Sequence, residues 1–458
     1  MSEKVVVIGG TAAGLSAASK AKRLKPDLDI KVFEKSGYIS YGACGLPYYV
    51  GDMIEDPEDL VSLTVDQMTN KRNIPTMIHR EVTVVDRDQK QVTVKDLDTD
   101  QIEVYPYDKL VIATGARPIK PNLPGIGAAG IYYLRTVEDG IRLKKKVKAE
   151  GKQTAAIIGG GFIGLEVAEE MTFAGIEVHV YEAMPRLLPF LEESFSEMIL
   201  DELEKNGVHV HLGSKVEEFQ TTDGWVSGIK TADGDSLEVN FVLMSIGVLP
   251  NTELAKEAGL ETGIKGAIVV NDQMQTSDPS IYACGDCVQM KNRITGSAVY
   301  VPLGTTANKQ GRIAGENVAG GKEAFPGVLG SMVTKVFDLY IAATGLTVQQ
   351  AADAGYDVAV SVVTKGDKAS YYPGSRENHI CLILDRKTGK LLGAQAVGSE
   401  SVAGRMNVFV TAITCQMTVE EINGLDLVYA PAVAPVYDPI LIAASQAMKK
   451  VDRQEDGV

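Results

Sequence analysis

The chain has 458 residues, 45% of them hydrophobic, which is enough for about three packed domains. Its 45 Lys and Arg against 60 Asp and Glu give a net charge of −15, which disfavours nucleic acid as a partner. No apolar stretch reaches the roughly 18 residues that cross a bilayer, and Val5–Ile8 is too short for a signal-peptide core, so we expect a cytoplasmic protein without a membrane partner.

The N-terminal residues predict a strand, a helix and a second strand. The apolar run Lys4–Ile8 leads into glycines, Leu15–Leu24 is an Ala-rich helical pattern, and Ile30–Glu34 ends in an acid. The turn reads Gly9-x-Thr11-x-x-Gly14, in which Thr11 replaces the second glycine of a dinucleotide fingerprint. Taken alone, this incomplete fingerprint is weak evidence for a nucleotide.

A buried strand and a domain crossing follow. Tyr107–Gly115 predicts the strand, and the Pro-rich segment Ala116–Gly125 predicts the crossing. The strand–helix–strand pattern then returns, with Gly159-x-Gly161-x-x-Gly164 in the turn and Glu182 eighteen residues later. This context is the one that a dinucleotide fingerprint needs, because the glycines allow a tight turn, close approach of the pyrophosphate and helix–strand packing.

The acid Glu182 favours NADH over NADPH. A carboxylate accepts a hydrogen bond from the ribose 2′-hydroxyl and repels a 2′-phosphate, although the nearby Arg186 is a cation that a 2′-phosphate could use. Two nucleotide units in one chain call for two nucleotides, and hydride exchange between nicotinamide and flavin is the commonest reason to hold both. After a second crossing at Val242–Asn251, Ala283-x-Gly285-Asp286 could place a carboxylate against a flavin ribityl chain.

The pattern changes after the Gly- and Pro-rich stretch Gly320–Gly330. Tyr356–Val363 and His379–Leu384 predict strands, and a helix is expected near Val402–Gln416, so a third, α+β domain begins at about residue 330.

These motifs together resemble the FAD- and NAD(P)-dependent pyridine nucleotide-disulfide oxidoreductases over nearly the whole chain. The resemblance implies an α/β fold with two Rossmann-like nucleotide-binding domains and a C-terminal α+β dimerisation domain. The implied division is 1–115 for the first part of the FAD domain, 116–251 for the NAD domain, 252–325 for the second FAD part, 326–450 for dimerisation and 451–458 for a tail. The implied cofactor-binding residues are Gly9, Thr11, Ala12, Ala13, Gly14, Glu34, Lys35, Ala113, Thr114, Gly115, Gly159, Gly161, Phe162, Ile163, Gly164, Glu182, Gly247, Gly285, Asp286 and Thr305.

The cysteines select a branch of the family. Members with a redox disulfide carry two cysteines a few residues apart after the segment matching Glu34, whereas this chain has only Cys44 there. It thus resembles the single-cysteine branch of coenzyme A disulfide and persulfide reductases, NADH peroxidases and water-forming NADH oxidases. A thiolate beside the flavin and near a helix N-terminus is expected to have a lowered pKa. Ala43 departs from a coenzyme A disulfide reductase pattern that has asparagine before the cysteine.

Other residues of the resemblance concern the substrate. Peroxidases and water-forming oxidases are expected to carry a histidine in the first glycine turn, where this chain has Thr11-Ala12-Ala13. Tyr371 and Tyr429 resemble tyrosines that the coenzyme A enzymes bring from the partner subunit to the cysteine, where a phenol can protonate a departing thiolate. Residues resembling coenzyme A contacts are Arg23, Ser40 and Lys71, each of which could equally be a solvated or capping residue.

The remaining cysteines and histidines are interpreted as structural. Cys284 and Cys287 have redox-motif spacing but flank Asp286 outside a matching strand–helix context, and Cys381 and Cys415 are expected in the core. Five scattered histidines are not expected to cluster into a zinc site, so no metal is predicted.

The sequence therefore predicts a homodimeric FAD enzyme in which NADH drives reduction of coenzyme A disulfide, coenzyme A persulfide or polysulfide through Cys44. Coenzyme A is then a substrate or a bound thiol. One alternative is an NADH oxidase or peroxidase that reduces oxygen or peroxide at the flavin. Another is a redox-sensing flavoprotein without significant turnover.

Overall fold

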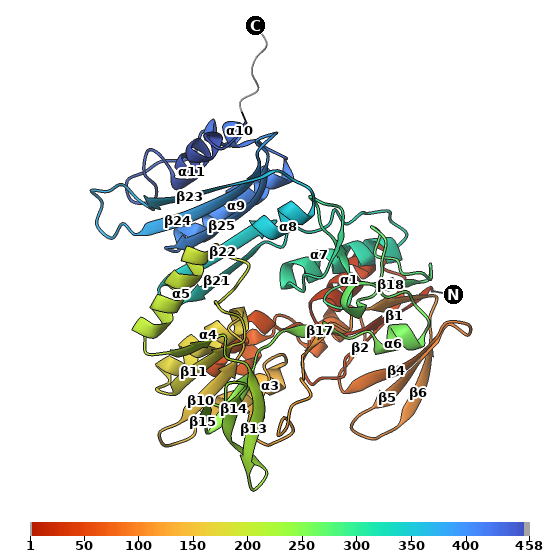
Figure 1. The fold of residues 1–458 in the computed structure, drawn as a ribbon. Coiled ribbons are helices and arrows are strands. Elements are labelled where there is room, and N and C mark those ends of the chain that lie inside the picture. The colour runs from red at the N-terminus through yellow and green to blue at the C-terminus, as the bar shows by residue number, and fades with distance from the viewer. Residues whose placement is uncertain (1, 453–458) are drawn as a thin grey trace.

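The computed structural model describes residues 2–452 and divides into three units (Figure 1). Of the tail predicted at 451–458, residues 453–458 lie outside the described residues. Two units built on parallel sheets lie in the lower half of the view, and the third, formed by the C-terminal part of the chain from Met332 onward, lies above them. No helix of residues 2–452 combines the length and the apolar character needed to cross a membrane.

The first unit is a parallel sheet in the order β18-β7-β1-β2-β3. Its strands are β1 (Lys4–Ile8), β2 (Asp29–Phe33), β3 (Thr76–Met77), β7 (Lys109–Ile112) and β18 (Ile281–Ala283). Helices α1 (Ala12–Leu24) and α7 (Gly304–Val318) pack together on it, and α6 (Glu253–Glu257) lies against a three-stranded antiparallel sheet of β4 (Arg80–Asp86), β5 (Gln91–Asp96) and β6 (Ile102–Pro106). Since β18 pairs with β7, a segment far along the chain returns to the N-terminal sheet.

The second unit repeats this plan between the two parts of the first. Its sheet has the order β12-β11-β10-β16-β9, with strands β9 (Ile131–Tyr132), β10 (Thr154–Ile158), β11 (Glu177–Glu182), β12 (His209–Leu212) and β16 (Phe241–Met244). Its helices are α3 (Val137–Val147), α4 (Phe162–Phe173) and α5 (Glu193–Lys205), and its antiparallel sheet joins β13 (Val216–Thr222), β14 (Trp225–Thr231) and β15 (Ser236–Glu238).

The two predicted crossings pair with each other. Strand β8 (Ala116–Pro118) runs antiparallel to β17 (Val248–Pro250), so the chain enters and leaves the second unit side by side. A short hairpin of β19 (Met290–Lys291) and β20 (Ala298–Val299) follows β18.

The third unit is an antiparallel sheet in the order β21-β22-β25-β24-β23. Its strands are β21 (Met332–Val336), β22 (Leu339–Gly345), β23 (Val358–Gly366), β24 (Glu377–Asp385) and β25 (Leu391–Gly398). Helices α9 (Ser401–Thr414) and α11 (Pro439–Met448) pack on the sheet, with α8 (Val348–Asp353) before β23 and α10 (Val419–Asn423) beside α11. The predicted fold class, two Rossmann-like units followed by an α+β unit, is confirmed.

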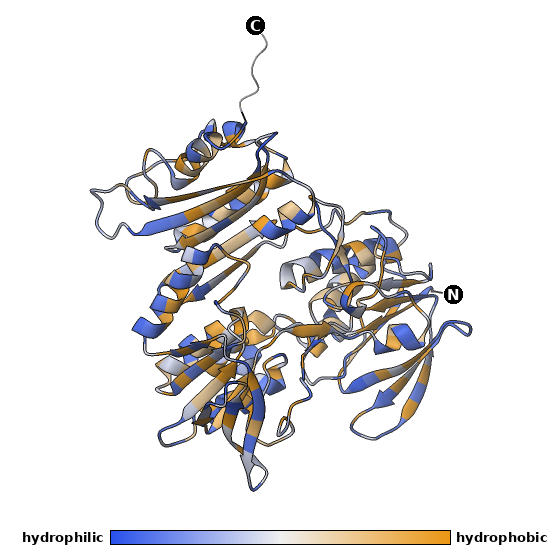
Figure 2. Cartoon of the chain, viewed as in Figure 1, coloured by the Kyte–Doolittle hydropathy of each residue, from blue (hydrophilic) through white to orange (hydrophobic). Residues whose placement is uncertain are grey.

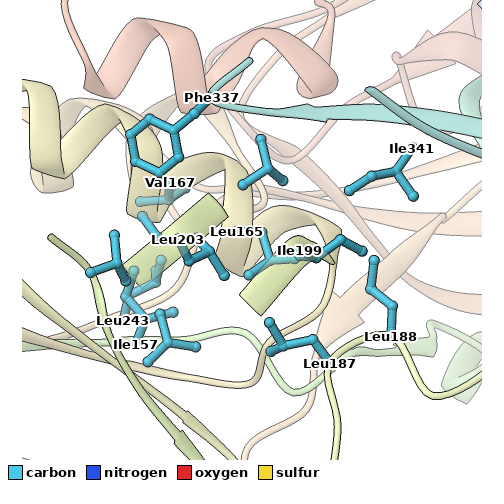
Figure 3. Packing of buried hydrophobic residues seen from close by; sticks show 14 of the residues in the cluster. Ile157, Leu165, Val167, Leu187, Leu188, Ile199, Leu203, Leu243, Phe337 and Ile341 are labelled. Atoms are coloured by element: carbon cyan, nitrogen blue, oxygen red, sulfur yellow. The ribbon is translucent and has the colours of Figure 1, made fainter. Parts of the chain in front are cut away.

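One apolar core joins the second unit to the third. Leu165 of α4 and Ile199 of α5 pack in the same cluster as Phe337 and Ile341, which lie at the hairpin of β21 and β22 (Figure 3). Hydrophobic colour follows the strands of the upper sheet, whereas the exposed side of α5 is hydrophilic (Figure 2). The third unit is therefore anchored on α4, the helix that begins at the second glycine turn.

Candidate active site

The first glycine turn leaves no room for side chains at its outer glycines. Gly9 has φ of +106°, and a Cβ there would lie 2.2 Å from the carbonyl oxygen of Ala113. A Cβ on Gly14 would lie 1.9 Å from the carbonyl oxygen of Gly9, so α1 lies directly against the turn. Glu34 accepts hydrogen bonds from the amides of Gly10 at 2.7 Å and Ser36 at 2.8 Å.

The second glycine turn has the same construction. Gly159 also has φ of +106°, and a Cβ on Gly164 would lie 2.2 Å from its carbonyl oxygen. Glu182 accepts from the amides of Gly160 at 2.9 Å and Met184 at 2.8 Å. A Cβ on Gly161, the middle glycine, would meet no atom within 4 Å, which leaves that side of the turn open to a ligand.

Both turns present the N-terminus of a long helix to a ligand. Thr11 precedes α1 and Gly161 precedes α4, and neither helix start is capped by a side chain. Unpaired N–H groups at such a position favour a phosphate group. Of the other fingerprint residues, Ala12, Ala13, Phe162 and Ile163 form the first turns of these two helices.

Asp286 brings a carboxylate to the first turn. Its Oδ2 lies 2.7 Å from a guanidinium nitrogen of Arg135, while its Oδ1 is buried and has no hydrogen-bond partner among the described residues. Gly285 has φ of +85°, and a Cβ there would lie 2.8 Å from that of Ala13. A buried acceptor beside a closely packed glycine turn fits a bound group that donates a hydrogen bond, as the hydroxyls of a flavin ribityl chain do.

Other predicted cofactor residues lie around these turns. Thr114 donates its hydroxyl to the carbonyl oxygen of Asn251 at 2.6 Å, next to the crossing of β8 and β17. Gly115 and Gly247 have φ of +66° and +103° at the ends of the two units' strands. Thr305 is exposed in the first turn of α7, and the exposed Lys35 lies 3.9 Å from Glu81.

Cys44 lies in a short turn, Ala43–Gly45, just before α2 (Leu46–Val50). Its side chain is exposed. Nevertheless the surrounding protein raises the pKa of its thiol, first by desolvating the thiolate and then through the charges of Glu166 and Asp286, while Arg135 acts in the opposite direction. The chain alone therefore does not lower the pKa of Cys44 as expected, because α2 is only five residues long and the charges of two carboxylates disfavour the thiolate.

Glu166 and Arg135 are site residues that the sequence did not reveal. Glu166 of α4 accepts from the hydroxyl of Thr334 in β21 at 2.6 Å, and burial raises the pKa of its carboxyl group. Neither residue belongs to a recognisable motif. Only the position of Glu166, two residues after Gly164 on the fingerprint helix, was a signal that could have singled it out.

The two predicted tyrosines lie together, although 58 residues separate them. Their hydroxyl oxygens are 3.4 Å apart, and the hydrogen bond to Tyr371 raises the pKa of Tyr429. Both are solvent-exposed, Tyr371 at 74% and Tyr429 at 49%. The loop between β23 and β24 that carries Tyr371 lies at the left edge of the upper unit, away from the first unit at the right (Figure 1).

A buried ion pair holds the tyrosine loops. Arg405 of α9 is paired with Asp438 at 2.8 Å and also donates to the backbone carbonyl of Asp367 at 3.0 Å. The amide of Ala369 donates to the carbonyl of Pro431 at 3.2 Å, which joins one loop to the other. The loops that carry the two tyrosines are therefore held in place by a buried ion pair and by backbone hydrogen bonds.

The predicted coenzyme A residues belong to three different segments of the first unit. Arg23 is exposed at the end of α1, and Lys71 is exposed at the end of a helical turn, Gln67–Lys71. Ser40, with φ of +50°, donates its amide to the carbonyl of Gly10 at 2.9 Å. Their side chains make no hydrogen bond or ion pair within residues 2–452, so the structure does not bring them into mutual contact.

The other cysteines differ in their surroundings. Cys284 and Cys287 are buried, and burial raises the pKa of Cys284 well above its usual value and that of Cys287 to about 11. Cys381 is in the core as predicted. The prediction for Cys415 is wrong, because it caps the C-terminus of α9 and is exposed.

The prediction that the histidines do not cluster is also wrong. The rings of His179 and His209 stack with centroids 4.5 Å apart, and His179 lies 3.1 Å from His211 between ring nitrogens. Distant in the sequence, these residues meet because β11 and β12 are neighbouring strands.

Comparison with known proteins agrees with this geometry. Residues 3–311 match the pyridine nucleotide-disulphide oxidoreductase family, and residues 332–438 match its dimerisation domain. The chain is 38% identical to an NADH oxidase of Methanocaldococcus jannaschii, over 98% of this chain and 100% of that protein. It is 36% identical to an NAD(P)H coenzyme A polysulfide/persulfide reductase of Pyrococcus horikoshii, over 97% and 98%.

A solved structure shows the same fold. The NAD-dependent persulfide reductase from A. fulgidus superposes with a TM-score of 0.94 at 39% identity, over 98% of this chain and 83% of that one. Members of this family bind FAD and NAD(P)H, in agreement with the two glycine turns and the unpaired Asp286 oxygen. The chain belongs to the pyridine nucleotide-disulphide oxidoreductase family.

Proposed function

We propose that the protein uses NADH and FAD to reduce coenzyme A disulfide, coenzyme A persulfide or polysulfide through Cys44. The observation that carries the proposal is that Cys44 is an exposed thiol beside the Arg135–Asp286 pair, while Cys284 and Cys287 are buried. A single thiol without an internal partner can form a disulfide only with a sulfur of another molecule, which is what exchange with a substrate disulfide requires. The persulfide reductases among the relatives support this substrate class.

The sulfur step balances as a thiol–disulfide exchange. The Cys44 thiolate attacks one sulfur of R–S–S–R′, forms Cys44–S–S–R and releases R′S⁻, which takes up a proton. Bound FAD would supply the transfer of two electrons from NADH. These two electrons and one further proton reduce the mixed disulfide to the Cys44 thiolate and RSH. In sum, one disulfide, NADH and H⁺ are converted to two thiols and NAD⁺.

In this exchange Arg135 can stabilise the attacking thiolate, and the tyrosines can supply the proton that the leaving thiolate takes up. Arg135 opposes the rise in the pKa of Cys44 and so favours the attacking thiolate. The phenol of Tyr429 is protonated at neutral pH because tyrosine normally titrates near pH 10, so it can donate a proton to R′S⁻. We assign these roles to Tyr371 and Tyr429 of the partner subunit in a homodimer, since both are exposed on a unit that matches a dimerisation domain.

The same proposal covers cofactor and substrate contacts. The first glycine turn and Asp286 would hold FAD, with the Asp286 carboxylate accepting from a ribityl hydroxyl, and the second turn would hold NADH, where Glu182 would repel a 2′-phosphate. Arg23, Ser40 and Lys71 serve coenzyme A, because the two cations are exposed on the unit that carries Cys44. We propose the domain division given above together with these assignments: the second unit binds NADH, and the third unit forms the dimer.

Reduction of oxygen is a second candidate, favoured by the identity to the Methanocaldococcus NADH oxidase. The first glycine turn contains Thr11, Ala12 and Ala13 and so offers no imidazole for peroxide chemistry. The two functions differ in their need for a sulfur substrate. NADH consumption in air without a sulfur substrate, compared with anaerobic consumption with coenzyme A disulfide or polysulfide, separates them.

The direct test replaces each exposed thiol in turn. C44S is expected to lose reduction of the sulfur substrate by at least 1000-fold while FAD binding and flavin reduction by NADH persist, whereas the control C415S retains wild-type rates. Mass spectrometry of the untreated protein should find any coenzyme A adduct on Cys44. Reduction of coenzyme A disulfide by C44S at the wild-type rate would show that the proposal is wrong.

The contribution of the partner subunit has its own test. Inactive C44S chains mixed with inactive Y371F/Y429F chains form about half heterodimers, each with one native site of two, so about a quarter of wild-type activity per site returns if the tyrosines act in trans. If they act within their own subunit, every site remains defective. No recovery after verified subunit exchange would therefore rule out the partner's role.

A further inference from the structure

A group of metal-ligating side chains lies on the sheet of the second unit, outside the proposed active site. Glu177 and His179 are two residues apart on β11 and so project from the same face, and His209 of β12 pairs directly with His179. One carboxylate oxygen and one ring nitrogen from each histidine all lie within 4.8 Å of one another. Three ligands from two strands thus converge on one point.

His179 is the fixed member of this group. The residue as a whole is 9% exposed, and among the described residues its buried Nε2 has no hydrogen-bond partner. Its Nδ1 lies 3.1 Å from Nε2 of His211, and the two rings are nearly coplanar, at 9°. When Nδ1–H donates to His211, the Nε2 atom presents a bare lone pair, which is the form in which a histidine binds a metal.

The carboxylate of Glu177 lies close to this nitrogen. Its Oε2 accepts from the hydroxyl of Thr154 at 3.3 Å, and its Oε1 lies 3.6 Å from Nε2 of His179, beyond hydrogen-bond distance. Tetrahedral zinc with ligand distances near 2.1 Å holds its ligand atoms about 3.4 Å apart. Glu177 is therefore already close to the required separation, whereas the exposed ring of His209, which stacks on that of His179, would have to rotate to direct a nitrogen at the ion.

We propose that Glu177, His179 and His209 bind a divalent transition-metal ion, with zinc as the reference ion and water completing its coordination. Two imidazoles and one carboxylate suit zinc, nickel and copper, whereas calcium and magnesium prefer sites made of oxygen alone. His211 is the outer partner that orients His179. The ion ties the edge strand β12 to β11 and so stabilises the second unit.

The inference does not depend on the proposed function, and its test measures metal binding. The FAD-loaded protein is titrated with Zn²⁺ in the presence of a competing chelator, and thermal unfolding is recorded with and without one equivalent of zinc. We expect one zinc per chain and a higher unfolding temperature in its presence. H209Q and E177Q, both at exposed positions, are expected to bind zinc at least tenfold more weakly and to lose the thermal shift.

Two control variants separate this site from others. H379Q removes a histidine of β24, and C44S removes the exposed thiol near the flavin turn; both are expected to keep the wild-type zinc affinity. The proposal is overturned if wild-type protein binds less than one zinc per chain. It is equally overturned if C44S abolishes zinc binding or if both H209Q and E177Q leave the affinity unchanged.

Discussion

Substitution of two glycines in the second turn separates packing from ligand binding. In G164A the new methyl would lie 2.2 Å from the carbonyl oxygen of Gly159, so α4 must move roughly 1 Å away from β10. Overpacking of this kind costs about 1–3 kcal/mol, of which the better helix propensity of alanine returns up to about 1 kcal/mol. Because the contact is with backbone at only 2.2 Å, we take the upper part of that cost, about 2–3 kcal/mol, and expect a net loss of about 1–2 kcal/mol in the free energy of unfolding of this unit.

G161A is the matched control. Gly161 has φ of −82° and ψ of 178°, which alanine adopts freely, and its Cβ would meet no protein atom within 4 Å. The stability of G161A should therefore stay within about 0.5 kcal/mol of the wild type. Its methyl instead enters the space that a pyrophosphate would occupy, so the KM for NADH should rise about tenfold or more.

The single tryptophan allows the two effects to be measured separately. Trp225 begins β14 of the second unit, so its fluorescence in urea follows the unfolding of that unit, while flavin fluorescence follows the first. With an m-value of about 2 kcal/mol per M, G164A should lower the Trp225 midpoint by about 0.5–1 M. An unchanged midpoint for G164A would refute the packing argument, and an unchanged KM for G161A would refute the position of the pyrophosphate.

Other predictions concern charge. Because Glu166 raises the pKa of Cys44, E166Q should shift the pH profile of Cys44 alkylation to lower pH, measured in FAD-free protein. An unchanged profile in the variant would mean that the carboxylate does not act on the thiol. E182A should raise the KM for NADH more than that for NADPH, and a tenfold NADPH preference in kcat/KM of the wild type, about 1.4 kcal/mol, would contradict the role of Glu182. R405M leaves Asp438 buried without its cation and should destabilise the third unit by about 3–5 kcal/mol, measured by urea unfolding. If the unpaired carboxylate is the cause, the double variant R405M/D438L should recover much of this loss.

The sequence was sufficient wherever function depends on neighbouring residues in the chain. The glycine turns, with Glu34 and Glu182 at the ends of the second strands, are local devices whose glycines the backbone requires. The surroundings of Cys44 could not be predicted, because Glu166 and Asp286 reach it only through the assembled fold. The histidine group depends likewise on the register of β11 with β12, which local periodicity does not determine.

The two nucleotide units differ in what covers their helices, and this difference matches their proposed tasks. In the first, α7 lies so close to α1 that a Cβ on Gly311 would be 2.3 Å from the carbonyl oxygen of Ala13, and the Gly285 turn closes on the same residue. A nucleotide held there is enclosed by its own unit, as suits a resident flavin.

In the second unit a Cβ on the middle glycine, Gly161, would meet no atom within 4 Å. The element that packs against helix α4 there is β21 of the third unit. Glu166 binds Thr334, and Glu169 of the same helix accepts from the amide of Phe337 at 2.8 Å and pairs with Lys335. The helix that starts at the second glycine turn is thus fixed along its middle to the unit that matches the dimerisation domain. Under the proposed function, an exchangeable nucleotide at this open turn could enter and leave while the contacts of α4 with the third unit stay in place.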